Sequence, residues 1–363
     1  MSEILKKSDW ILIGAIALLL IISLLSIASV SQNKTSFLTN FNKQLIFVFL
    51  GACIFFILSV LDYRILRNYS SVVLVIYFLS VILLAVLLFV GTSTRGAVSW
   101  FRIGAFNFEP SELVKFILIA TLAKYFSSRH IEFGLFRHII ISGIYTLIPV
   151  TLLVLQPDLG GAILILAVWV GMMFFAGIRA RHLLALFLIF TVVSGVSWQF
   201  ILKDYQRARI FTFFEPQSDP LGRGYNVTQS IIAVGSGGVF GKGLGHGTQS
   251  QLNFLPERHT DFIFATIAEE WGFMGIIFVF LLWGTIFWRL AMIGSNSSNN
   301  FARLFVWGFW LLLLGHFTIN VGMNMGLMPI TGIPLSMISY GGSSLVTTFL
   351  SFGIINNIRI NSV

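Results

Sequence analysis

Charged residues and cysteine are scarce in this sequence. Asp, Glu, Lys and Arg make up only 10 % of the 363 residues, against roughly 25 % in soluble domains, which excludes a water-soluble globular protein. The single cysteine, Cys53, lies in an apolar run, so no internal disulfide can form. Hydrophobic residues make up 56 % and the mean hydropathy is +0.90, which also excludes a solvated, disordered chain. The composition predicts an integral membrane protein.

Acidic residues are fewer than basic ones, at 14 against 23, and the formal net charge is +9. In a soluble protein this surplus would favour nucleic-acid binding. In a membrane protein, the basic residues of the cytoplasmic loops explain it more simply. We therefore expect no nucleic-acid partner.

Several apolar runs approach the length of about 20 residues that a helix needs to cross a bilayer. They lie at 10–29, 45–61, 72–91, 113–127, 139–156, 159–177, 183–202, 272–293, 302–323 and 343–358. The fourth is long enough if its helix begins near Pro110, a favoured first-turn residue. The first follows Lys6 and Lys7 but has no clear A-x-A cleavage site, so we expect a retained signal-anchor. The sequence predicts an all-α polytopic membrane protein with about ten transmembrane helices.

Basic residues fall mainly on one side of these spans. With a cytoplasmic N-terminus, the inner side carries Lys6, Lys7, Arg64, Arg67, Lys124, Arg129, Arg137, Arg179, Arg181, Arg289, Arg303 and Arg359. The short outer loops carry only Lys34, Lys43, Arg95 and Arg102. Because an excess of Lys and Arg marks cytoplasmic loops, we expect both termini in the cytoplasm.

One long connection, at about 203–260, is predicted to be an extracytoplasmic loop, and residues 1–363 to form a single transmembrane domain. Loops of this length are usually functional or disordered. Aromatic residues such as Phe213 and Tyr225 favour a folded loop. Its glycine-rich part, 235–247, is not a phosphate-binding P-loop, because Lys242 is followed by glycine instead of Ser or Thr. We expect closely packed backbone there.

Ionisable residues near the outer ends of the spans are the candidate site residues. Such a group costs at least about 2.5–3.5 kcal/mol near a helix centre, so it normally faces a cavity or a partner. Glu112 and Lys115 are spaced i, i+3 and share a helical face. They form either an interfacial pair with Lys115 extending outward or a buried pair lining a hydrophilic groove. Asp158 precedes a predicted helix, where capping explains it, so we expect an orienting role.

The densest polar segment is 255–262. Asp261 lies near the predicted start of a helix, where a cap contributes about 1 kcal/mol, although Thr260 could cap equally well. Arg258 and His259 are adjacent, so this segment must face something polar. A carboxylate at such a boundary can act as a general base toward a hydroxyl group, contributing typically about 10²–10⁴-fold. The spacing leaves both interpretations open.

The last span begins after a glycine-broken segment, 339–344, whose free N–H groups favour an anion site. Pro329, Gly332 and Pro334 predict a broken element at the same level, which is tolerated only where it is buried or lines a cavity. We expect a diphosphate to be held by this helix end, which includes Ser343, and by nearby basic side chains, namely Lys115, Arg207, Arg209 and Arg258.

Metal ligation has little support in the sequence. No H-x-x-H or C-x-x-C spacing occurs, so we expect no protein-held metal site. His316 is expected to be a hydrogen-bonded residue of the helix bundle. A divalent cation, Mg²⁺ or Mn²⁺, that bridges a substrate phosphate to Asp or Glu leaves no sequence signature and stays open.

Four separated segments resemble the signatures of the SEDS family (shape, elongation, division and sporulation). They are 108–112, FEPSE; 156–160, QPDLG; 247–265, GTQSQLNFLPERHTDFIFA; and 339–343, SYGGS. The sequence of residues 247–252, GTQSQL, resembles the rod-shape branch of the family more than the division branch. The resemblance extends over essentially the whole chain, and Asn253, where relatives often carry Glu, is a minor departure.

The resemblance implies a peptidoglycan glycosyltransferase that maintains rod shape during cell elongation. Members polymerise lipid II, undecaprenyl-diphospho-MurNAc-pentapeptide-GlcNAc, on the outer leaflet of the bacterial cytoplasmic membrane. They work with a class B penicillin-binding protein and other membrane proteins of the elongation complex. The family's essential aspartate falls on Asp261. Its other sensitive positions fall on Trp100, Glu112, Lys115, Asp158, Arg207 and Arg209.

The implied reaction is an inverting glycosyl transfer. Asp261 would deprotonate the acceptor hydroxyl group, and Lys115, Arg207 and Arg209 would neutralise the departing diphosphate. Trp100 would stack against sugar or lipid.

Two other functions fit the composition. About ten helices with broken elements would suit a lipid II flippase. It would need a polar route to the cytoplasmic side, where the inner halves of the spans have almost no carboxylates. A non-catalytic scaffold for a class B penicillin-binding protein is the second alternative. An assay that separates translocation from polymerisation distinguishes the three.

Overall fold

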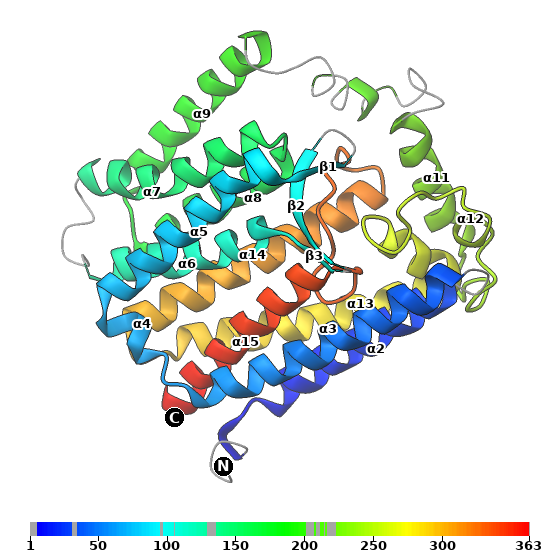
Figure 1. The fold of residues 1–363 in the computed structure, drawn as a ribbon, viewed down its shortest axis with the longest axis horizontal. Coiled ribbons are helices and arrows are strands. Elements are labelled where there is room, and N and C mark those ends of the chain that lie inside the picture. The colour runs from blue at the N-terminus through cyan, green and yellow to red at the C-terminus, as the bar shows by residue number, and fades with distance from the viewer. Residues whose placement is uncertain are drawn as a thin grey trace.

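The computed structural model describes residues 6–30, 35–94, 97–104, 106–128, 136–200, 207, 211–213, 215 and 223–362. It is a bundle of helices with one small sheet (Figure 1). The helices are α2 (Trp10–Val30), α3 (Thr35–Val60), α4 (Arg64–Asn68), α5 (Ser70–Val90), α6 (Pro110–Ser127), α7 (Phe136–Leu155), α8 (Leu159–Ala176), α9 (Ala180–Phe200), α11 (Arg223–Ser236), α12 (Thr248–Gln251), α13 (Ile263–Ser295), α14 (Asn300–Asn324) and α15 (Gly342–Ser362). The strands are β1 (Thr92–Thr94), β2 (Ala97–Ile103) and β3 (Phe106–Phe108).

Every apolar run predicted to span the membrane falls on a helix. Within the described part of the chain, seven helices are long and apolar enough to cross a bilayer: α2, α3, α5, α7, α8, α13 and α14. The prediction of an all-α polytopic membrane protein is confirmed. The helices α6 and α15 are more polar because they bury side chains such as Glu112 and Asn356. That the chain crosses the membrane ten times stays a prediction.

The last helix lies inside the bundle, where α15 packs along α3 and also contacts α6. Helix α14 packs against α6, α8 and α13. Residues near the two ends of the chain meet at one end of the bundle (Figure 1). There the fully buried Asp9 forms ion pairs with Arg289 and Arg359. An isolated buried carboxylate would be very costly, so these cations are needed to keep Asp9 charged in the interior.

The far end of the bundle carries the sheet and the broken segment that precedes α15. The three strands are antiparallel in the order β1-β2-β3. Strand β3 leads directly into α6, which begins at Pro110 as predicted. Since α15 has 21 residues, at 1.5 Å per residue the two ends of the bundle are about 30 Å apart along it.

The predicted loop contains ordered helix. Residues 223–260 form α11 and α12, which pack on α13, whereas most of 203–222 lies outside the described residues. The membrane helix expected at 272–293 was predicted to begin too late, because α13 begins at Ile263. Gly272 breaks its regular geometry, with φ +67° and ψ −165°. The apolar pattern begins anew after this break, which explains the late prediction.

The glycine-rich segment supplies hydrogen-bond partners for the backbone groups of α13 that the break leaves without their usual helical partners. In a regular helix the carbonyl groups of Glu269 and Glu270 would accept from residues 273 and 274. Here they accept from the N–H groups of Lys242 and Gly243, at 3.0 Å each. The freed N–H groups of residues 273 and 274 donate to the carbonyl groups of residues 238 and 239. A Cβ atom on Gly241 would lie 2.2 Å from the Glu270 carbonyl oxygen, so the predicted close packing is confirmed.

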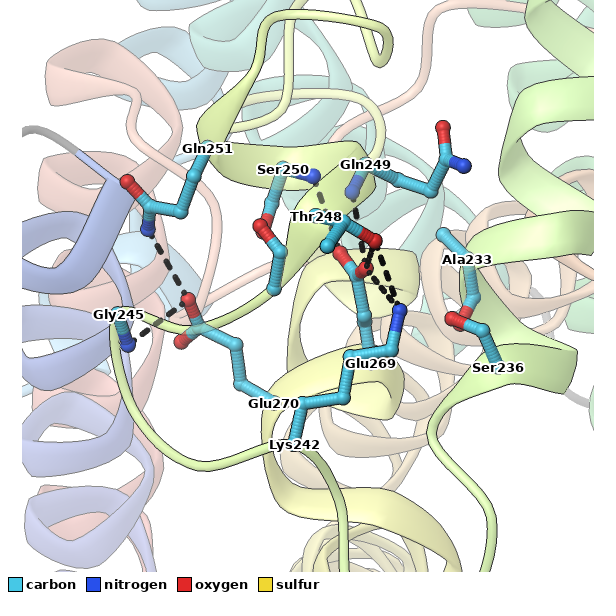
Figure 2. Close-up of polar contacts among 11 residues, drawn as sticks. Ala233, Ser236, Lys242, Gly245, Thr248, Gln249, Ser250, Gln251, Glu269 and Glu270 are labelled. Atoms are coloured by element: carbon cyan, nitrogen blue, oxygen red, sulfur yellow. Dashed lines mark hydrogen bonds and ion pairs between the residues drawn. The ribbon is translucent and has the colours of Figure 1, made fainter.

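The side chains of Glu269 and Glu270 fasten the same segment to α13 (Figure 2). Glu269 accepts from Lys242 Nζ, Thr248 Oγ1 and the N–H groups of Gln249 and Ser250. Glu270 accepts from Ser29 Oγ, the N–H group of Gly245 and Gln251 Nε2. Both carboxylates are almost fully buried. Hydrogen bonds to a charged group are about twice as strong as neutral ones, so residues 242–251 are held firmly in place.

Candidate active site

A polar cavity of about 690 Å³ opens at the end of the bundle where α15 begins. Its lining comes from segments that are far apart in the sequence: the sheet, the α7–α8 turn, the residues before α13 and the residues before α15. Each of the four family-like motifs contributes to it. The predicted site residues that line the cavity are Trp100, Asp158, Asp261 and Ser343.

Asp261 lines this cavity and is partly exposed. It lies one residue before Phe262, the N-cap of α13, and Thr260 Oγ1 bonds to Glu257. Its carboxylate faces Gly332, where an added Cβ atom would lie 3.7 Å from Oδ2. A carboxylate placed in a polar cavity is suited to acid–base chemistry.

Asp158 caps a helix, as the sequence predicted. It is the N-cap of α8, and its Oδ1 accepts from the N–H group of Gly161 at 2.8 Å. This bond satisfies one of the free N–H groups of the first turn. Asp158 also lines the cavity, and its orienting role stays a prediction. Capping and exposure to the cavity thus coexist in one side chain.

Trp100, Glu109 and Ser343 join the sheet to the start of α15. The Trp100 indole N–H donates to Glu109 Oε2 at 3.0 Å, and the N–H group of Glu109 donates to Ser343 Oγ at 2.9 Å. Burial, and secondarily the nearby Glu112, raise the pKa of Glu109 to about 7, although Lys115 opposes this rise. The cavity therefore contains a carboxyl group that exchanges its proton near neutral pH.

Glu112 and Lys115 form a buried ion pair. Lys115 Nζ lies 2.6 Å from Glu112 Oε1, and their side chains are 4 % and 5 % exposed. Of the two alternatives, the outward-extending lysine is wrong. The pair does not line the cavity itself, but it is close enough to influence the pKa of Glu109, which does. It supplies fixed charges behind the cavity wall.

The predicted arginines are not brought together. Arg258 donates to the carbonyl groups of Ser250 and Gln251 in α12, and Arg207 donates to that of Gln199, so neither lines the cavity. Arg209 lies outside the described residues. Among the described residues, the cation that lines the cavity is Lys43 of α3, which the sequence marked only as an outer-loop charge.

Sequence reasoning also missed Glu109, His259 and Tyr340 as cavity residues. The Tyr340 N–H group donates to the His259 carbonyl group at 2.8 Å, and their rings lie 5.7 Å apart, edge to face. All three belong to or adjoin the family-like segments, and that proximity was the available signal. In the described part of the chain, no cluster of three His, Cys, Asp or Glu residues could hold a metal ion without substrate.

We expect stability to depend on the protonation of Glu109. Because its folded pKa of about 7 exceeds the ordinary glutamate pKa of 4.5, the folded protein binds the proton more tightly than the unfolded chain does. Its contribution to stability is fully present below about pH 4.5 and is lost as the pH rises through about 7. The decline is at most about 1.4 kcal/mol per pH unit. Thermal unfolding between pH 4.5 and 8 should show this decline in the wild type but not in Glu109→Gln. Parallel curves would contradict it.

Comparisons with known proteins agree with this geometry. A family model described as Cell cycle protein, for FtsW, RodA and SpoVE, matches residues 5–363. The peptidoglycan glycosyltransferase MrdB of Escherichia coli K12 is 37 % identical over 293 residues, 81 % of this chain and 79 % of that protein. A chain from a solved structure described as "Structural coordination of polymerization and crosslinking by a peptidoglycan synthase complex" is 34 % identical, with a TM-score of 0.83 and 98 % of each chain covered. The Thermus thermophilus rod shape determining protein RodA is 28 % identical, with a TM-score of 0.71, covering 97 % of this chain and 96 % of that one.

The fold and the cavity define a multi-pass membrane enzyme with a polar site at an end of its helix bundle. The chain belongs to the family of FtsW, RodA and SpoVE, the SEDS family that its motifs resemble. It is a peptidoglycan glycosyltransferase.

Proposed function

We propose that this chain polymerises lipid II into glycan strands during cell elongation, with Asp261 as the general base. The observation that carries the proposal is the position of Asp261, which lines a polar cavity with its carboxylate facing Gly332. A general base must reach the proton that it removes, and a cavity of about 690 Å³ has room for part of a saccharide.

The proposed orientation places this cavity outside the cell. Basic side chains such as Arg64, Arg289 and Arg359 lie near the end where the chain termini meet, and basic residues mark the cytoplasmic side. The cavity is about 30 Å away along α15, which is the thickness of a bilayer core. Both termini would then be cytoplasmic and the cavity would meet the outer leaflet, where lipid II is presented for polymerisation.

The reaction transfers a glycan strand to a hydroxyl group. Asp261 removes the proton from the 4-hydroxyl group of the GlcNAc of the acceptor lipid II. That oxygen forms a bond to the anomeric carbon of the growing strand, while the bond from this carbon to undecaprenyl diphosphate breaks. The diphosphate leaves with the electron pair, and the anomeric configuration inverts. Trp100, in the cavity wall, stacks against sugar or lipid.

Charge on the departing diphosphate needs compensation. Lys43 and the N-terminal residues of α15, including Ser343, line the cavity and are the described groups suited to an anion. Lys115 adds positive charge from behind the wall. We retain Arg207 and Arg258 as candidates that would have to move toward the substrate, and Arg209, outside the described residues, as a further candidate. Oxygen donors on Asp158 and Asp261 fit Mg²⁺ or Mn²⁺, which binds one or two carboxylates together with phosphate. Such a cation would neutralise phosphate charge.

A class B penicillin-binding protein is the proposed partner, together with other membrane proteins of the elongation complex. The similar chain from a complex that coordinates polymerisation and crosslinking supports this proposal. A polymerase of glycan strands needs a crosslinking activity next to it, because uncrosslinked strands do not form a wall.

Purified full-length chain in vesicles, with and without the partner, should convert lipid II to polymer. The same vesicles report translocation if labelled lipid II is placed in one leaflet. Polymer without translocation supports the proposed enzyme. Translocation without polymer would instead identify a flippase, and neither activity, with tight partner binding, would identify a scaffold.

A further inference from the structure

The main chain of Asp261 is held by two asparagines of α14. Its carbonyl oxygen accepts from Asn320 Nδ2 at 3.1 Å and from Asn324 Nδ2 at 3.0 Å. The two residues are one helical turn apart and therefore lie on the same face of α14. Both are fully buried, with 0 % exposure. A buried carbonyl oxygen has two lone pairs, and both are used here.

The same side chains fix the surroundings of Asp261. Asn324 Oδ1 accepts from the N–H group of Ala265 at 3.2 Å, which is one of the free donors in the first turn of α13. Asn320 Nδ2 also donates to the carbonyl group of Ile333 at 2.8 Å. Asn320 therefore sets the distance between Asp261 and the segment that contains Gly332, and Gly332 is what the Asp261 carboxylate faces.

Two further bonds hold these segments in register. Ser339 Oγ donates to the carbonyl group of Thr260 at 2.7 Å, and the N–H group of Tyr340 donates to that of His259. With its main chain held at residues 259, 260 and 261, Asp261 has little freedom other than rotation of its own side chain.

We infer that Asn320 and Asn324 are positioning residues for the glycosyl transfer. They hold the Asp261 main chain so that its carboxylate projects into the cavity at the height of Gly332. The inference rests on the proposed function of Asp261 and deepens it. Misplacing a reacting group by about 1 Å can lower a rate about 10²-fold, so the effect should appear in kcat, while substrate binding by the rest of the cavity remains.

The test compares two buried asparagines with similar surroundings. Asn320→Leu keeps the branching of the side chain and removes the amide. Asn356→Leu is the matched control, since Asn356 is 2 % exposed and bonds to Ser8 and Ser59 at the end of the bundle opposite the cavity. Both full-length variants are reconstituted in vesicles, and lipid II polymerisation is measured per folded molecule.

We expect Asn320→Leu to lower kcat by about 10–10²-fold with KM within about threefold, and Asn356→Leu to change neither beyond twofold. Equal loss of kcat in both variants would show a purely structural role and overturn the inference. If Asn320→Leu does not fold, Asn320→Ala, which leaves room for a water molecule at the carbonyl group, and Asn324→Ala replace it with the same expected loss of kcat.

The Asp261→Asn variant separates the two levels of the argument. If it still polymerises at the wild-type rate, Asp261 is not the base and the proposed mechanism fails. If it is inactive while Asn320→Ala and Asn324→Ala keep a normal kcat, the base stands and only the positioning role fails.

Discussion

Replacing Asp261 with asparagine is expected to lower lipid II polymerisation by at least about 10²-fold, the smaller end of what a general base contributes. Asparagine has nearly the same shape but cannot accept the proton of a sugar hydroxyl group. The fold should survive, because the asparagines of α14 bind the main chain of residue 261, which the substitution does not change. Polymer formation per folded molecule, with thermal unfolding measured in parallel, checks both statements.

Asp158→Asn is the matched comparison, since it removes a second carboxylate from the same cavity. Asparagine is as good an N-cap as aspartate, so the bond to Gly161 and the start of α8 should persist. We expect a smaller loss of activity, because Asp158 orients and does not remove the proton. Equal losses in the two variants would mean that the cavity needs negative charge in general. Wild-type activity in Asp261→Asn would contradict the mechanism.

Lys115→Met is expected to destabilise the folded protein by about 3–5 kcal/mol, the range found when one partner of a buried ion pair is removed. Lys115 and Glu112 are almost fully buried and 2.6 Å apart. Without the lysine, the Glu112 carboxylate remains in the interior with no ion-pair partner at that position, and it must either stay charged at great cost or take up a proton. Chemical unfolding in detergent measures the change in the free energy of unfolding.

The double variant Glu112→Gln/Lys115→Met tests the cause. Removing both charges should recover most of the lost stability, because replacement of a whole buried pair is often neutral. The loss in the single variant should also depend little on salt, since buried pairs are weakly screened. If the double variant is as unstable as the single one, packing of the lysine stem is responsible and the electrostatic explanation is wrong.

The helical architecture was predictable because long apolar runs mark the spanning helices of a membrane protein. Ten apolar runs fall on ten helices, and Pro110 marks the start of α6 as expected. His316 is also the hydrogen-bonded bundle residue that was predicted, through Ser336. These features depend on local composition and on the cost of burying polar groups in lipid, which single sequences carry.

The site was predictable only in part. The resemblance marked Asp261 as the essential aspartate, and Asp261 lines the cavity, whereas spacing alone left it as a possible cap. Arg258 donates to the carbonyl groups of α12, and its predicted contact with a diphosphate stays a prediction. Lys43 lines the cavity from α3, about 200 residues away in sequence from Asp261. No local pattern encodes a contact over that separation.

The break in α13 at Gly272 could not be predicted from the sequence either. The freed backbone groups around Gly272 are satisfied by residues 238–243, so the break exists only because that segment is present. A sequence window over α13 shows one apolar helix with a glycine, and glycine alone does not show that another strand of backbone inserts there.

The ion pairs of Asp9 with Arg289 and Arg359 have a consequence for biogenesis. Helix α3 obtains its main packing partner, α15, only after roughly 280 further residues have been translated, which takes about 15–60 s at ~5–20 residues per second. Until then Asp9, which is fully buried in the folded protein, lacks its ion-pair partner Arg359. A nonsense mutation that deletes the last twenty residues should therefore leave the translocon with an incomplete bundle, which membrane proteases would degrade.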